Sequence, residues 1–175
     1  MNNLDHLTLI LNKPQIQQKI ERIAHEIYEN HYSEKRFVFV AIEERGVVLA
    51  NRLSKIIENI SEISVEVVNF KIDKKAPLKN NNELNLDTNQ VKSSMFFLVD
   101  DVLNSGKTLM HAAARILSFN VKELRTIILV DRTHRRFPIR ADYVGKNIPT
   151  ASSESVKVSL SEIDGKDCVE IIAGA

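Results

Sequence analysis

The sequence contains a single cysteine, Cys168, among its 175 residues. One thiol can form neither an internal disulfide nor a cysteine-based metal cluster, and such cysteine usage is typical of a reducing cytosol. No stretch approaches the roughly 20 apolar residues of a membrane-spanning helix. The N-terminus also lacks a charged region followed by an apolar one. These absences predict a cytoplasmic protein that makes no use of a membrane.

The chain likewise has no large excess of either charge, since its formal net charge is +1. Such a chain has no overall attraction to nucleic acid or membrane, so any anion site must be local. The composition, with 43% hydrophobic and 27% charged residues, is that of an ordinary globular protein. A chain of this length can bury one sizeable core. We therefore expect one domain spanning residues 1–175.

The stretch from Met95 to Leu117 has the strongest pattern. An apolar run, Met95 to Val99, is followed by two carboxylates, Asp100 and Asp101. After two more apolar residues come Asn104-Ser105-Gly106-Lys107-Thr108, and then apolar residues at helical spacing. The pattern predicts a strand with an acidic end, a turn of small residues and a helix.

This arrangement suits a phosphorylated sugar. In an open α/β sheet, ligands bind beyond the carboxyl ends of the strands. A helix start favours phosphate, and Ser105 to Thr108 supply hydroxyl donors, close backbone approach and one cation. Asp100 and Asp101 would repel a phosphate, so we expect them to face sugar hydroxyls or Mg²⁺.

Two other interpretations of this stretch are weaker. A nucleotide-binding P-loop, G-x-x-x-x-G-K-[ST], would need glycine at position 101, where the chain has Asp101. A helix cap formed by Ser105 would explain the turn. It would not explain two adjacent acids at a strand end.

The rest of the chain alternates between strand and helix patterns. We expect further strands at Leu7–Leu11, Arg36–Ile42, Val65–Phe70 and Leu124–Val130, and further helices at Pro14–Asn30 and Val47–Ile57. Such alternation predicts an α/β fold with a doubly wound parallel sheet. Between the first core strand, Arg36–Ile42, and its helix, Glu43 to Gly46 reads as a polar turn whose glycine lets the backbone approach an anion.

Two segments depart from this alternation. Lys71 to Lys92 is polar with weak periodicity, which is typical of a working lid or of a solvated, lysine-rich loop. Val156–Leu160 and Val169–Ile172 flank Asp164-Gly165, which predicts a hairpin. We expect this hairpin to form a small antiparallel appendage over the strand ends.

The central pattern, hydrophobic-hydrophobic-Asp-Asp-x-x-x-[Ser/Thr]-Gly-x-Thr, resembles the phosphoribosyl diphosphate (PRPP) motif of type I phosphoribosyltransferases. Four segments extend the resemblance over nearly the whole chain and narrow it to the PyrR group of pyrimidine-operon attenuators and uracil phosphoribosyltransferases. They read ERIAHEIYE, FVAIEERGVVLANRL, LVDDVLNSGKT and VDRTHRRFPIRADYVGKNIPT.

The resemblance implies a type I phosphoribosyltransferase fold, a flexible lid at about 71–92, and a hood formed by the N-terminal segment and about 133–175. It also implies a homodimer or larger homo-oligomer. Its implied site residues are catalytic Asp100, Asp101 and Arg45; PRPP-binding Asp100, Asp101, Asn104, Ser105, Gly106, Lys107, Thr108, Arg45 and Gly46; and base-binding Tyr143, Val144 and Arg132. Mg²⁺ would be held by the two aspartates indirectly, through PRPP.

Departures from the family pattern bear on the substrate. Asn104 lies where purine-salvage relatives commonly carry an aspartate that exchanges a proton with the purine. An amide cannot do this, so uracil is favoured, with UMP and diphosphate as products. Lys71 stands where the resembled group has arginine, and a lysine cannot bind an anion through a forked guanidinium. Transfer to uracil would therefore be slow.

The resemblance leaves a second function open, a UMP- or UTP-sensing regulator that binds an mRNA leader. Arg22, Arg135, Arg140 and Lys146 match RNA-binding positions of the resembled group. Glu21 replaces a neutral residue there and would repel an RNA phosphate. The same basic cluster could instead be a solvated rim of the active site.

Overall fold

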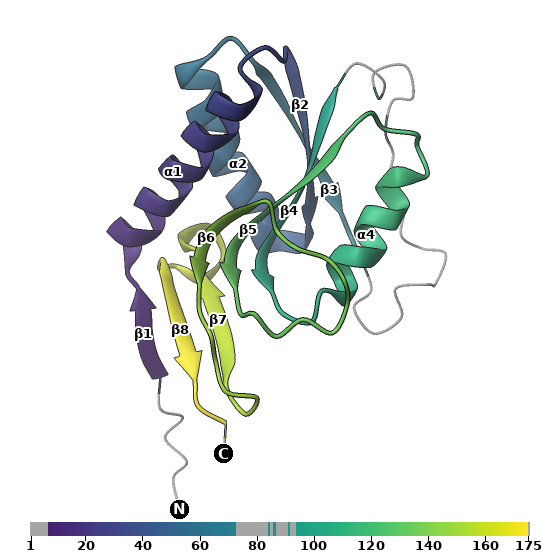
Figure 1. The fold of residues 1–175 in the computed structure, drawn as a ribbon. Helices are drawn as coiled ribbons and strands as arrows, with labels where there is room; N and C mark the ends of the chain where they lie inside the picture. The colour runs from purple at the N-terminus through teal and green to yellow at the C-terminus, as the bar shows by residue number, and fades with distance from the viewer. Residues whose placement is uncertain (1–6, 73–83, 85, 87–90, 92–93, 175) are drawn as a thin grey trace, which may run out of the picture.

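The structure is a computed structural model that describes residues 7–72, 84, 86, 91 and 94–174 (Figure 1). Its main sheet is parallel, in the order β3-β2-β4-β5-β6. These strands are β2 (Arg36–Ile42), β3 (Ser64–Phe70), β4 (Met95–Leu103), β5 (Leu124–Asp131) and β6 (Tyr143–Asn147). The helices around them are α1 (Lys13–His31), α2 (Glu43–Ile60) and α4 (Lys107–Leu117). The predicted doubly wound α/β fold is confirmed.

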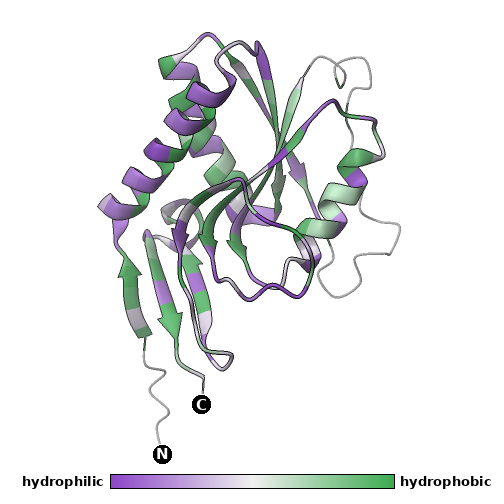
Figure 2. Cartoon of the chain, in the orientation of Figure 1, coloured by the Kyte–Doolittle hydropathy of each residue, from purple (hydrophilic) through white to green (hydrophobic). Residues whose placement is uncertain are grey.

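The central strands of the main sheet, β2, β4 and β5, are buried on both faces. Alternate residues of a strand point to opposite faces. In β2, Phe37 and Phe39 therefore pack with α1 and α2, while Val38 and Val40 pack with α4. Figure 2 shows the central strands as largely hydrophobic along their length. In these three strands the polar residues therefore lie near the strand ends.

Helix α1 begins where the sequence predicts it. Asn12 accepts a hydrogen bond from the Gln15 N–H at 3.0 Å, and the Gln15 side chain accepts one from the Asn12 N–H at 2.9 Å. This reciprocal capping box satisfies two otherwise unpaired donors.

No helix in the described ranges combines the length and apolarity that crossing a bilayer requires.

Strands from both ends of the described chain form a second, smaller sheet. It is antiparallel, in the order β1-β8-β7, and we call it, together with α5, the hood. Its elements are β1 (Leu7–Leu11), β7 (Ser155–Ser159), α5 (Ser161–Asp164) and β8 (Cys168–Ile172). The predicted antiparallel pairing of the last two strands is confirmed, although a short helix replaces a tight turn. Residues 133–175 do not belong wholly to this sheet, because β6 joins the main sheet.

The predicted lid, about 71–92, lies mostly outside the described residues. Its described members include Ile72, Leu84 and Val91, which are buried in the hydrophobic cluster on the α4 side of the sheet.

The predicted polar turn from Glu43 to Gly46 is wrong. Helix α2 starts at Glu43 directly after β2, and the chain reverses through the left-handed φ of 51° at Glu43. Carboxylates in the first turn of a helix favour this start, because they lie at the positive end of its dipole. Arg45 and Gly46 are therefore helical residues.

The hood is attached to α2 through ion pairs. Arg52 donates hydrogen bonds to both oxygens of Asp167, at 2.8 and 2.9 Å, and its Nε donates to Glu162 at 2.9 Å. The hydrogen bond from Arg52 lowers the pKa of the Asp167 carboxyl from 3.8 to about 2. The ionised Asp167 carboxylate therefore stabilises the folded protein.

Asp167→Asn should therefore reduce stability in a pH-dependent way. The pKa of Asp167 is lowered by folding, so its contribution is present above about pH 4 and is lost as the pH falls toward 2. We expect the variant to be about 1 to 2 kcal/mol less stable at pH 7, with the difference shrinking toward zero near pH 2. Urea denaturation of both proteins across this range measures it. The exposed Glu29 offers a matched Glu29→Gln control, and an Asp167→Asn effect that does not depend on pH would contradict the ion-pair explanation.

Candidate functional site

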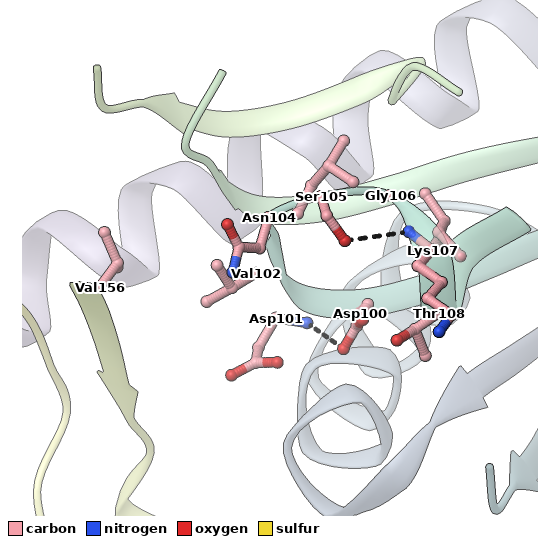
Figure 3. A pocket seen from close by; sticks show the side chains of 11 residues that line it. Asp100, Asp101, Val102, Asn104, Ser105, Gly106, Lys107, Thr108 and Val156 are labelled. Carbon is pink, nitrogen blue, oxygen red and sulfur yellow. Dashed lines mark hydrogen bonds between the residues drawn. The ribbon is translucent and has the colours of Figure 1, made fainter. Parts of the chain in front are cut away.

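A cavity of about 330 Å³ lies at the carboxyl end of β4 (Figure 3). It is bounded by the end of β4, the turn that follows, the first residues of α4 and one residue of the hood. Its lining consists of Asp100, Asp101, Val102, Leu103, Asn104, Ser105, Gly106, Lys107, Thr108, Leu109 and Val156. The structure thus brings both predicted aspartates and the whole predicted phosphate turn into one cavity.

The turn into α4 is held in place by its neighbours. Gly106 has a φ of 86°, and an added Cβ would lie 2.7 Å from a methyl group of Ile139, so glycine is required on both grounds. The Ser105 carbonyl accepts hydrogen bonds from the N–H groups of Arg136 and Phe137 at 2.9 and 3.1 Å. Ser105 Oγ also accepts from the Lys107 N–H at 3.3 Å. The start of α4, where backbone N–H groups lack intrahelical acceptors, therefore lies at the cavity, which Lys107 and Thr108 line.

The two aspartates are not equivalent. Both belong to β4, and Figure 3 shows Asp100 on the side of Thr108 and Asp101 directed away from it. Asp100 is only 7% exposed, and its Oδ1 accepts the Asp101 N–H at 2.9 Å. Asp101 is half-buried. Asp100 therefore helps to shape the strand end, while Asp101 is the more accessible carboxylate.

Arg45 lies beside the cavity without lining it. Its guanidinium binds Asp164 of α5, and this hydrogen bond, together with the nearby charge of Asp101, raises the pKa of Arg45. The same bond lowers the pKa of Asp164. Gly46 is buried, and an added Cβ would lie 2.9 Å from the Val99 carbonyl oxygen. Gly46 is therefore required where α2 crosses β4, a reason that differs from the predicted approach of an anion.

Arg132 and Asn104 form a contact at the edge of the cavity. Arg132 is 7% exposed, and its Nη1 donates to Asn104 Oδ1 at 3.1 Å. It also donates to the Thr150 hydroxyl and the Glu154 carbonyl. These acceptors are neutral, so a buried cation is held largely by dipoles. Because a guanidinium only donates, the Asn104 amide must turn its oxygen toward Arg132.

The predicted base contacts at Tyr143 and Val144 do not lie at the cavity. Parallel β6 begins at Tyr143, whereas the cavity lies at the carboxyl ends of the strands. Tyr143 is 4% exposed, and its hydroxyl contacts His31 Nε2 at 2.9 Å. Burial raises the pKa of Tyr143 and lowers that of His31. The Val144 carbonyl accepts a hydrogen bond from Arg22.

The four predicted RNA-binding residues lie on α1, on β6 and in the loop between β5 and β6. Arg135, Arg140 and Lys146 are exposed. Arg135 is also ion-paired with the buried Asp131. Arg22 donates to the carbonyls of Val144 and Gly145, and so ties α1 to β6.

Sequence reasoning missed two residues near the site. Val156 of β7 lines the cavity, and Asp164 of α5 binds Arg45. A lone valine carries no chemical signal, and Asp164 followed by Gly165 reads only as a turn. Both residues reach the site through the packing of the hood, which the sequence pattern does not specify.

No group of three or more His, Cys, Asp or Glu side chains in the described part of the chain could hold a metal ion. Asp100 and Asp101 supply two carboxylates at the cavity. Mg²⁺ prefers oxygen ligands and usually takes one or two carboxylates together with substrate phosphates and water. The residues present thus fit a cation that arrives with a phosphorylated substrate.

The parallel sheet, the strand-end carboxylates and the helix N-terminus at the cavity define a protein of the phosphoribosyltransferase class. Solved structures support this fold. The hypoxanthine-guanine phosphoribosyltransferase (hpt-2) of Bacillus anthracis has a TM-score of 0.72 at 19% identity, covering 99% of this chain and 100% of that one. The hypoxanthine phosphoribosyltransferase of Trypanosoma cruzi has a TM-score of 0.75 at 17% identity, covering 96% and 97%.

Sequence comparisons define the family. A model of the phosphoribosyl transferase domain matches residues 6–163. The "Bifunctional protein PyrR" of Clostridium novyi is 37% identical over 178 residues, covering 96% of this chain and 98% of that protein. Its counterpart from Clostridioides difficile is 38% identical over 172 residues, covering 93% and 96%. The chain belongs to the phosphoribosyl transferase family, and within it to the PyrR group.

The contact between Arg132 and Asn104 yields a stability prediction. Asn104→Asp would give the buried guanidinium a charged acceptor, so we expect the variant to be about 1 kcal/mol more stable at pH 7. Arg132 should hold the pKa of the new carboxyl below its usual value of about 3.9, so the gain should vanish as the pH falls through this range. Urea denaturation at pH 7 and pH 3 tests this. The Asn104→Ala control should be destabilised at both values, and an Asn104→Asp variant no more stable than wild type at pH 7 would refute the prediction.

Proposed function

We propose that this protein transfers the 5-phosphoribosyl group of PRPP to uracil, giving UMP and diphosphate. The main support is the cavity itself, which combines two strand-end carboxylates with a helix N-terminus. PRPP explains this combination because it carries two kinds of group. Its phosphates need hydrogen-bond donors and a cation, whereas its ribose hydroxyls need acceptors.

The 5′-phosphate would bind at the turn from Ser105 to Thr108. The α4 dipole and its first N–H groups attract the anion, and the Lys107 ammonium adds a positive charge. Asp101, and Asp100 behind it, would accept hydrogen bonds from the ribose hydroxyls. Their negative charge would also stabilise the positive charge that develops at the anomeric carbon.

The diphosphate would bind Arg45, which is near enough to Asp101 for their charges to interact. Gly46 supports this placement indirectly, because it lets the first turn of α2 approach β4 closely. When bound, Mg²⁺ would neutralise part of the charge of the departing diphosphate, with Asp100 and Asp101 acting on it through PRPP. Catalysis would consist mainly of positioning and electrostatics, because the diphosphate leaves with its electron pair and no protein nucleophile is needed.

The base would lie against Val156, which faces the cavity across from the phosphate turn. This replaces the predicted contacts with Tyr143 and Val144. Asn104 keeps its amide oxygen on Arg132, so the amide NH₂ is the group it can offer to a ligand. An amide cannot exchange a proton with a purine ring, which supports a pyrimidine.

The test is a PRPP-dependent assay of diphosphate release with uracil, hypoxanthine and guanine. We expect turnover with uracil alone. Asp101→Asn should reduce this turnover at least tenfold, because it weakens a charge interaction with the ribose. Its melting temperature should change little, since Asp101 is only half-buried.

A matched control separates binding from folding. Asp100→Asn alters a carboxylate that is 7% exposed, so it should lower the melting temperature as well as the rate. Comparable turnover with purines would rule out the uracil assignment. A large loss of stability with unchanged PRPP affinity in Asp101→Asn would make that carboxylate structural.

The homodimer or larger oligomer stays a prediction, for which sedimentation is the direct measurement.

A second function, binding of an mRNA leader, is favoured by the exposed basic residues Arg135, Arg140 and Lys146. The word "bifunctional" in the names of the PyrR relatives also fits two activities. In this function the nucleotide site would sense UMP or UTP. Phosphate contacts would then supply much of the affinity for RNA.

Salt dependence tests this second function. Arg140→Ala and Lys146→Ala should each reduce the slope of log K against log salt by about 0.7 to 0.9 for a pyrimidine-operon leader hairpin. Lys55→Ala is a suitable control, since Lys55 is exposed on α2, outside the basic cluster. Equal binding of the hairpin and an unrelated RNA at physiological salt would exclude leader recognition.

A further inference from the structure

The Arg45 guanidinium and the Asp164 carboxylate form a two-point contact between α2 and the hood. Arg45 Nε lies 3.1 Å from Asp164 Oδ2, and Arg45 Nη2 lies 2.6 Å from Asp164 Oδ1. The side chains are 34% and 19% exposed, so solvent reaches the pair. Asp164 Oδ2 also accepts the Leu160 N–H at 2.9 Å.

This contact uses the side of the guanidinium that best suits a phosphate. Carboxylates and phosphates bind arginine in the same way, through two parallel N–H donors. Arg45 is also the residue to which the proposed function assigns the diphosphate. Asp164 therefore holds the position on Arg45 that a diphosphate oxygen pair would take.

We propose that Asp164 and the diphosphate of PRPP compete for Arg45, so that diphosphate binding releases α5 of the hood from the first turn of α2. The proposal rests on the proposed function, because it takes Arg45 as the diphosphate-binding cation. Asp164 is then a positioning residue. It orients the Arg45 guanidinium before PRPP binds and is displaced from it by the diphosphate.

Release at Asp164 would act on the base side of the cavity. Helix α5 directly follows β7, and β7 carries Val156. Arg52 still holds Glu162 and Asp167, which lie on either side of Asp164. The exchange would thus remove one of three carboxylate anchors of a short connection. The whole connection, from the wall against which the base lies to the start of β8, would then open more often.

Competition predicts a gain of affinity when the competitor is weakened. Asp164→Asn keeps an oxygen that can accept the Leu160 N–H but removes the charge that holds Arg45. We expect calorimetry to show inorganic diphosphate with Mg²⁺ binding about threefold to tenfold more tightly to the variant, since solvent-exposed ion pairs have modest strength. UMP, which carries only the 5′-phosphate, should bind equally well to both proteins.

Two matched variants separate this effect from general loosening of the hood. Asp167→Asn removes a carboxylate from the same segment, but one that is bound to Arg52, so diphosphate affinity should not change. In an Arg45→Gln background, Asp164→Asn should give no gain. Should Asp164→Asn fold poorly, Asp164→Ser removes the same charge.

The single cysteine provides a readout that is independent of affinity. Cys168 begins β8, directly after the segment that α5 anchors, and is 5% exposed. Diphosphate with Mg²⁺ should increase the rate at which a thiol reagent labels wild-type Cys168 severalfold. The Asp164→Asn variant should already be labelled faster without ligand.

The outcomes distinguish the inference from the function on which it rests. If wild type binds diphosphate and Asp164→Asn binds it equally or more weakly, with labelling unaffected by ligand, the competition is refuted and the proposed function stands. If wild type binds neither diphosphate nor PRPP, both are refuted.

Discussion

The parallel register of β2, β4 and β5 is the constraint on which the site depends. Val38 to Val40 and Phe96 to Leu98 pair within a layer that is buried on both faces. A polar side chain placed there would lose its water without compensation. Parallel strands end at the same edge, so Asp101 near the end of β4 and Arg132 just after β5 are brought to the same region. The chemistry is therefore concentrated where the apolar layer stops.

The hood is attached near this edge by ion pairs, whereas the strands of the main sheet are held by apolar packing. Two arginines on one side of α2, Arg45 and Arg52, hold the connection between β7 and β8 through carboxylates. Partly exposed ion pairs are individually weak, typically about 0 to 1 kcal/mol. An anionic ligand can replace one of their partners at low cost. A hood held only by apolar packing would not respond to a phosphorylated substrate in this way.

The sequence predicted the features that depend on local patterns. Apolar periodicity located the main strands and helices. The pattern from Asp100 to Thr108 located the cavity, because every lining residue except Val156 lies in one continuous segment. Features that depend on side-chain direction were harder to predict. Tyr143 looked like a base contact from its motif, yet it begins β6 under α1, at the end of the strand away from the cavity.

The polar turn expected at Glu43 to Gly46 failed for a related reason. Glycine can mark a turn, an anion site or a close helix-to-strand crossing, and sequence alone does not distinguish these uses. At Gly46 the 2.9 Å approach to the Val99 carbonyl identifies the crossing. Asp164 escaped notice because its partner, Arg45, lies 119 residues away in the chain. Such a contact exists only once the hood is in place.

The basic residues that could contact RNA differ in whether their side chains already have partners in the fold. Arg22 and Arg135 are already engaged, by the carbonyls of Val144 and Gly145 and by Asp131 respectively. An RNA phosphate that binds either arginine must compete with an acceptor that is in place, whereas Arg140 and Lys146 are exposed side chains on the same part of the fold. Contacts with Arg140 and Lys146 would therefore attract any RNA. Binding through Arg22 and Arg135 would need phosphates placed well enough to compensate for the acceptor that is lost.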